Sequence, residues 1–155
     1  MATEAVATEA GTWPMRPTLP AALSRRLVDA AVLAATDLSV PVTVVIVDES
    51  GVLRELCRMD RAALVSVETA TSKAYAAVAV GMPPDEFYGT IEADGAAVAW
   101  LASHPGLALL GGGIPVIADG QVAGAIGVAG AMTAAEDRRI AETALERALP
   151  QAGRR

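Results

Sequence analysis

The apolar and polar positions along the chain follow two different periods, and each period predicts one kind of element. From Leu23 to Leu38 apolar side chains recur at three- and four-residue spacing, which predicts a helix over residues 20–38 with Pro20 in its first turn. Residues 42–48 (VTVVIVD) are β-branched and almost wholly apolar, which is typical of a strand buried on both faces. Residues 52–59 (VLRELCRM) alternate between two faces and predict the returning strand of a hairpin.

The middle of the chain has a helical pattern. Residues 62–80 are nearly all small and apolar, and Gly81 with the following Pro83-Pro84 pair ends the predicted helix. Residues 85–104 are predicted to form helix in short pieces. The first two thirds of the chain therefore follow the order α-β-β-α.

A second hairpin and a capped helix complete the pattern. The segments IPVIA and QVAGAIGVAGA flank Asp119-Gly120, a two-residue loop of the kind favoured by type I′ hairpins. Thr133 and Glu136 form a Thr-x-x-Glu capping box, which opens a last helix that runs through Leu149. The full order, α-β-β-α-β-β-α with tight hairpins, predicts a single α+β domain whose antiparallel sheet is covered by helices.

Composition adds an expectation about assembly. Hydrophobic residues make up 53% of the chain and aromatic residues only 3%, so most of the apolar surface belongs to Ala, Val, Leu and Ile. A small monomer has difficulty hiding this much apolar surface, and subunit contacts are the simplest way to bury it. We therefore expect a homo-oligomer. We place the domain at residues 18–150, between a flexible arm over residues 1–17 and a disordered tail over residues 151–155.

Charge and targeting signals exclude several classes of partner. The formal net charge of −6 argues against nucleic acid as a partner, because phosphate binding needs a basic face. No run approaches the ~18 apolar residues of a spanning helix, and no signal peptide is visible, so we expect a cytoplasmic protein without a membrane partner. Cys57 is the only cysteine, which leaves no disulfide framework and no thiolate metal cluster.

The helix over residues 62–80 carries an unusual polar stripe. Ser66, Thr69 and Lys73 recur at i, i+3 and i+7 within an otherwise apolar surface. If the helix is central, Lys73 must face a partner carboxylate, an anionic ligand or a wet cavity, and the pattern leaves these alternatives open. Arg54 and Arg58 share one strand face, where they would either add positive charge to the same pocket or stay exposed.

The glycines of the second hairpin have two interpretations. Gly124, Gly127 and Gly130 lie in a predicted strand, where missing side chains allow either another backbone or a ligand to approach closely. Gly111-Gly112-Gly113 precedes a strand and no Gly-Lys-Ser/Thr follows it, so it is not a P-loop. Gly112 and Gly113 remain candidates for ligand binding through bare backbone.

The remaining candidates are single residues. His104 is the only histidine, so a zinc site of the usual kind is not expected. It lies in a Ser-His-Pro-Gly turn, where it is either a loop residue or an imidazole that ligates haem iron or acts as a general base. Cys57 is predicted to lie in the core. Asp48, Asp60 and Asp137 border strands or helix starts, where capping and turn formation account for them.

Three segments together resemble the GlcG/HbpS family, which is related to the C-terminal domain of PduO-type proteins. They are Arg58-Met59-Asp60 with the Ser66–Lys73–Ala74 helix, then GGGIPVIADGQVAGAIGVAGA, then Glu136-Asp137 before the last helix. The resemblance covers residues 20–149 and implies a profilin-like fold with an antiparallel sheet of about five strands. It also implies assembly as dimers up to octamers and, for some members, binding or degradation of haem.

The chain departs from the family pattern at three places. The usual Met-Asp-Gly-Ala is Met59-Asp60-Arg61-Ala62, so a large cation replaces a residue without a side chain. The usual Ser-Gly of the last strand is Ala129-Gly130, and the usual Gln before Asp137 is Glu136. The first change lies next to the helix that carries Lys73. We therefore expect the Arg61 side chain to alter the shape and charge of the pocket beside that helix.

Three functions follow as hypotheses. The first is a binding protein for haem or another flat anionic ligand, held by Lys73, Arg54 and Arg58, with His104 the only imidazole. The second is a cofactor-independent isomerase, cyclase or lyase acting on a small carboxylate, with Lys73 as acid or anion clamp and Asp60, Glu92 or His104 as base. The third is an accessory subunit without a ligand. The fold alone does not choose among them.

Overall fold

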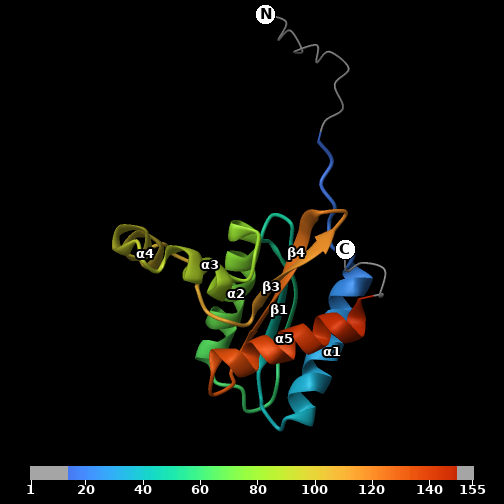
Figure 1. Cartoon of the computed structure of the whole chain (residues 1–155). Coiled ribbons are helices and arrows are strands. Elements are labelled where there is room, and N and C mark those ends of the chain that lie inside the picture. Colours follow the sequence, from blue (N-terminus) through green and yellow to red (C-terminus); the bar gives the residue numbers. More distant parts are fainter. Residues whose placement is uncertain (1–13, 150–155) are drawn as a thin grey trace, which may run out of the picture.

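The computed structural model describes residues 14–149 and shows one antiparallel sheet covered by helices on both faces (Figure 1). The predicted tail over residues 151–155 and most of the predicted arm lie outside the described residues. The elements are α1 (Ala21–Asp37), β1 (Thr43–Asp48), β2 (Leu53–Arg58), α2 (Val65–Val80), α3 (Pro84–Ile91), α4 (Gly95–Ala102), β3 (Gly113–Ala118), β4 (Gln121–Ala129) and α5 (Ala134–Ala148).

The sheet has four strands in the order β2-β1-β4-β3, and all its pairings are antiparallel. The α+β class is confirmed, whereas the expected count of about five strands is one too high for the described residues. Residues 84–102 form the helices α3 and α4, so only the two hairpins supply strands. β1 lies between β2 and β4 and is buried on both faces, as its continuous apolar run predicts.

Two apolar layers hold the helices to the sheet. On one face α1 and α5 pack together over side chains such as Val44, Ile46 and Ile126. On the other face α2 packs through alanines against Val45 and Val47. The stripe of small residues in α2 therefore lets this helix approach the sheet more closely than larger side chains would allow.

Two glycines of β4 lie against neighbouring backbone, and Gly127 makes the close approach of α2 possible. A Cβ added to Gly127 would lie 2.1 Å from the Ala70 carbonyl oxygen of α2, and one added to Gly124 would lie 2.4 Å from the Val47 carbonyl oxygen. Neighbouring backbone, and not a ligand, occupies the space at both positions. Of the two interpretations of these glycines, the structure selects the packing one.

The local signals at the turns and caps are confirmed. Asp119 and Gly120 both have positive φ angles, 50° and 75°, as the two-residue hairpin loop requires. The Thr133–Glu136 capping box is formed in both directions at the start of α5. This box fixes where α5 begins, and the position of that helix start matters for the site below.

The helix α4 projects from the body of the domain, and α3 lies between α4 and α2 (Figure 1). α4 has the sequence GAAVAWLA and no buried residue, and it packs chiefly against α3. Within residues 14–149 none of the helices is long and apolar enough to cross a bilayer.

Candidate functional site

The polar stripe of α2 faces the point where β4 ends and α5 begins. Ser66 and Lys73 are buried and Thr69 is half-buried, and all three line one cavity of about 260 Å³. Lys73 is only 1% exposed and is the only lysine of the chain, since every other basic side chain apart from the single histidine is an arginine. The predicted stripe is therefore a real wall of a cavity.

Lys73 forms a buried ion pair. Its Nζ donates to Oδ2 of Asp137 at 2.8 Å and to the Val128 carbonyl oxygen at 3.1 Å. Oδ1 of Asp137 accepts from the Ala131 N–H at 3.0 Å, so both carboxylate oxygens are held. Of the alternatives for Lys73, the partner carboxylate is observed.

Asp137 lines the cavity and pairs with Lys73, but the sequence pattern did not identify it as a site residue. Its place just after the capping box suggested only that it caps the start of the last helix. In the structure it is buried against Lys73, which lies 64 residues earlier in the chain. Burial raises the pKa of its carboxyl above the ordinary value, and the hydrogen bonds from Lys73 and Ala131 offset part of that rise. The signals in the sequence were a lysine on an otherwise apolar helix and the place of Asp137 in a segment that carries the family resemblance.

The hydroxyl groups around the pair are bound to neighbouring atoms. The Ser66 hydroxyl is hydrogen-bonded to the Thr43 hydroxyl at 2.7 Å and to the Ala63 carbonyl oxygen. The Thr69 hydroxyl donates to the Val65 carbonyl oxygen at 3.0 Å. The rest of the wall comes from Ala63, Val65, Leu110 and residues 129–134.

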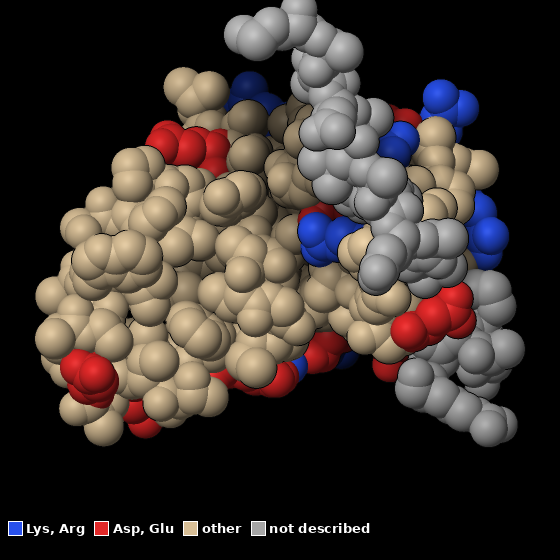
Figure 2. All heavy atoms as spheres, turned by 90° about the horizontal axis from the view of Figure 1, so that it is seen from above, with Lys and Arg blue, Asp and Glu red and all other residues tan. Residues whose placement is uncertain are grey.

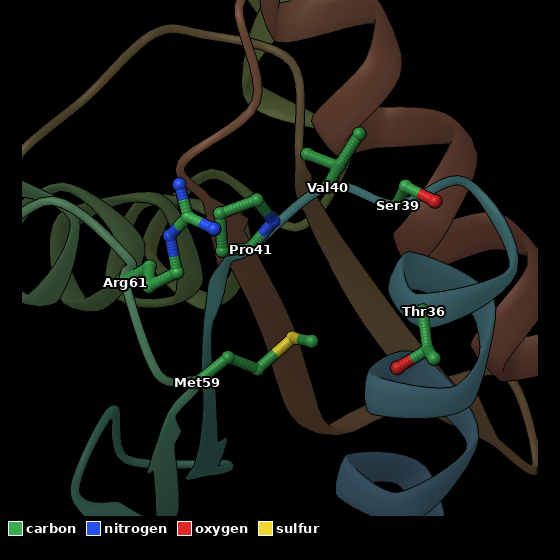
Figure 3. Close-up of a pocket in the computed structure, with 6 residues that line it drawn as sticks. All are labelled: Thr36, Ser39, Val40, Pro41, Met59 and Arg61. Carbon is green, nitrogen blue, oxygen red and sulfur yellow. The ribbon is translucent and has the colours of Figure 1, made fainter.

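A second cavity, of about 460 Å³, lies beside the end of α1. Its lining residues are Thr36, Ser39, Val40, Pro41, Met59 and Arg61. Figure 3 shows Met59 extending toward the Thr36 side of this cavity, whereas Arg61 lies at its opposite edge, beyond Pro41. Arg61 has a φ angle of +70°, a conformation that favours glycine. Glycine, which the resemblance implies at this position, would be unstrained there.

The structure does not bring all the predicted site residues together. Arg54 contacts Asp48 and Thr18, and Arg58 donates to the Ala62 carbonyl oxygen. Both lie on the edge strand β2, which β1 separates from β4 and the Lys73 cavity. The prediction that they share a pocket with Lys73 is therefore wrong, and the other alternative, exposed arginines, is observed.

The single-residue candidates lie outside both cavities. Asp60, Glu92 and His104 are exposed and belong to neither lining set. The His104 ring packs edge-on against Trp100, with ring centroids 5.3 Å apart. Cys57 is half-buried, and not in the core as predicted, because the edge strand β2 is covered on fewer sides.

Gly112 and Gly113 lie against Lys73. A Cβ on Gly112 would come within 3.1 Å of the Lys73 Nζ, and one on Gly113 within 2.3 Å of the Lys73 carbonyl oxygen. These glycines make room for the lysine and its helix. Among residues 14–149 there is also no group of three or more His, Cys, Asp or Glu side chains placed to hold a metal ion.

Comparison with known proteins agrees over nearly the whole described region. A family model described as haem degrading protein HbpS-like matches residues 19–146. The corrinoid adenosyltransferase PduO of Citrobacter freundii is 38% identical over 122 residues, which are 77% of this chain and 36% of that protein. The chain thus spans about a third of PduO.

Solved structures show the same likeness. The crystal structure of a double mutant of Streptomyces reticuli HbpS has a TM-score of 0.80 and 31% identity, covering 94% of this chain and 97% of that one. The crystal structure of a PduOC:heme complex has a TM-score of 0.75 and 32% identity, covering 84% of this chain and 94% of that one.

Proposed function

The chain belongs to the HbpS-like family, and on that premise we propose that it is a small-ligand-binding protein for which haem is the first ligand to test. The observation that carries the proposal is the cavity that combines Arg61, Met59 and an apolar wall. The haem complex of the PduO relative supports the choice of ligand.

The residues of this cavity fit a flat anionic ligand such as haem. The Arg61 guanidinium group would bind a carboxylate, Val40 and Pro41 would pack against an apolar face, and the thioether of Met59 is a group that ligates haem iron. A bound haem would supply redox chemistry at its iron. The role of the chain's own side chains is to bind and orient it.

The backbone at Arg61 supports a functional role for this side chain. A residue other than glycine at φ +70° carries a strain of about 1–2 kcal/mol. Arg61 is a cation held in a strained conformation at the edge of a cavity, and strain of this kind concentrates at functional positions.

Replacement of Arg61 by glycine tests the proposal. We expect the variant to bind haemin about tenfold more weakly, because it loses a charge-assisted hydrogen bond. We also expect it to be about 1–2 kcal/mol more stable, because the backbone strain is relieved. Haemin titration followed by the Soret band measures the first effect, and urea unfolding measures the second.

Two further variants serve as controls. Arg139→Ala removes one exposed positive charge on α5, away from the cavity, and should bind haemin like the wild type. His104→Ala should do the same, since His104 lies outside the cavity. A wild type without a saturable Soret shift would exclude haem, and a loss of binding in His104→Ala would move the haem site to His104.

The proposal includes a homo-oligomer, for which α4 supplies the surface. The side of the molecule that carries α3 and α4 has few charged side chains (Figures 1 and 2). Trp100 of α4 is 63% exposed, and the same chain has a largely apolar groove lined by Leu64, Val65, Val67 and Glu68. A second copy of this chain carries the same groove and the same exposed tryptophan, so each copy can cover the apolar surface of the other.

Replacement of Trp100 by glutamate is expected to shift the protein toward monomer. The charge would have to be buried in the contact, which is unfavourable without a partner. Light scattering after size exclusion measures the mass. The matched control is Leu33→Glu on α1, where the side chain is 54% exposed, and it should keep the wild-type mass. An unchanged mass for Trp100→Glu would remove α4 from the contact.

A further inference from the structure

We propose that the cavity over the Lys73–Asp137 pair is a second binding site, for a small uncharged carbonyl compound. This cavity shares no lining residue with the Arg61 cavity. The inference therefore does not rest on haem binding and goes beyond it.

The first argument is an unused donor. A lysine ammonium group carries three hydrogens. Asp137 and the Val128 carbonyl oxygen accept two of them, and within residues 14–149 no acceptor is placed for the third. Lys73 lines the cavity, so a ligand with an oxygen atom can accept this remaining hydrogen bond.

The second argument is the choice of lysine. All eleven other Lys/Arg positions of the chain are arginines. Arginine is the usual residue for a buried ion pair, because its planar group binds a carboxylate through two hydrogen bonds. The compact, rotatable ammonium of Lys73 instead binds one carboxylate oxygen and keeps a donor for another acceptor.

The third argument is charge balance, which selects a neutral ligand. The positive charge of Lys73 is already matched by Asp137 at 2.8 Å. The start of α5 is positive through its dipole, but the Glu136 carboxylate already supplies a negative charge there by accepting from the Thr133 N–H. A carboxylate ligand would place a second negative charge beside Asp137, which is unfavourable in a buried site. A carbonyl oxygen accepts the hydrogen bond without that repulsion.

The fourth argument is size. The cavity of about 260 Å³ lies below the roughly 300–1,000 Å³ of pockets for drug-sized ligands. Ala63, Val65, Leu110 and Ala129 make much of its wall apolar. The ligand class is therefore a short aldehyde, ketone or amide, whose oxygen faces Lys73 and whose alkyl group faces this wall.

Propionamide and propionate form a matched pair of probes, since they have nearly the same size and differ in charge. Because Lys73 is the only lysine, protein labelled with ¹³C,¹⁵N-lysine gives one set of side-chain NMR signals. We expect propionamide to shift these signals saturably, and propionate to bind at least about tenfold more weakly. Tighter binding of propionate, or no saturable shift with either probe, would overturn the proposal.

A pair of variants tests whether propionamide binds in the cavity over the Lys73–Asp137 pair. Thr69 lines the cavity, whereas Thr71 is exposed on the same helix, and both hydroxyls donate to the carbonyl oxygen four residues earlier. Thr69→Phe should fill the cavity and weaken propionamide binding by at least about tenfold, while Thr71→Phe should leave it unchanged. Neither variant should alter haemin binding. Unchanged propionamide binding in Thr69→Phe would show that the probe binds elsewhere and would refute the site.

Discussion

Replacement of Lys73 by methionine is expected to lower the free energy of unfolding by about 3–5 kcal/mol. Methionine keeps most of the volume of the lysine but removes the only cation beside Asp137. Asp137 is itself buried and would become an uncompensated charge held only by the Ala131 N–H. Urea unfolding followed by circular dichroism measures the loss.

A double variant separates charge from packing. If the cost in Lys73→Met comes from the unpaired carboxylate, then Lys73→Met combined with Asp137→Leu should recover most of the lost stability, because apolar replacement of a whole buried pair is often neutral. Equal losses in the single and double variants would instead assign the effect to packing around α2.

The same variant has a predicted pH dependence. Burial raises the pKa of Asp137 above its unfolded value, and the loss of the Lys73 hydrogen bond raises it further. The folded state then binds a proton at Asp137 more tightly than the unfolded state does. The contribution of Asp137 to the free energy of unfolding is therefore highest below its unfolded pKa of about 3.9, and it falls as pH rises through the folded pKa. The deficit of Lys73→Met relative to the wild type should therefore narrow toward acid pH.

Replacement of Gly127 by alanine is expected to destabilise the protein by about 3 kcal/mol. The new Cβ would lie 2.1 Å from the Ala70 carbonyl oxygen and 2.7 Å from the Ala74 nitrogen, both of which are backbone atoms of α2. Relief of this overlap requires α2 to move away from β4 and opens the alanine layer beneath it. A urea midpoint reports the loss.

Gly89 provides a matched control for this substitution. It lies within α3, and a Cβ there would meet no atom within 4 Å. Gly89→Ala should be neutral or stabilise by about 0.5–1 kcal/mol, because alanine favours helix. A similar loss in both variants would contradict the explanation by close packing at Gly127.

The sequence by itself determined the elements and their order. Periodicity placed α1 and α2, the apolar run placed β1, and Asp119-Gly120 placed the second hairpin. These signals are local, because they depend on backbone preferences and on which side chains share a face. The polar stripe of Ser66, Thr69 and Lys73 could also be predicted from a local pattern, because one helix carries all three residues.

Only the tertiary structure decided what these side chains meet. The strand order β2-β1-β4-β3 separates Arg54 and Arg58 from Lys73, and the start of α5 brings Asp137 to it across 64 residues. Such contacts depend on how elements distant in the chain stack, which no local pattern specifies. The positive φ angle of Arg61, and the cavity beside it, likewise arise from the packing of two segments. The chain thus encodes its folding elements residue by residue, whereas both candidate sites exist only once those elements pack together.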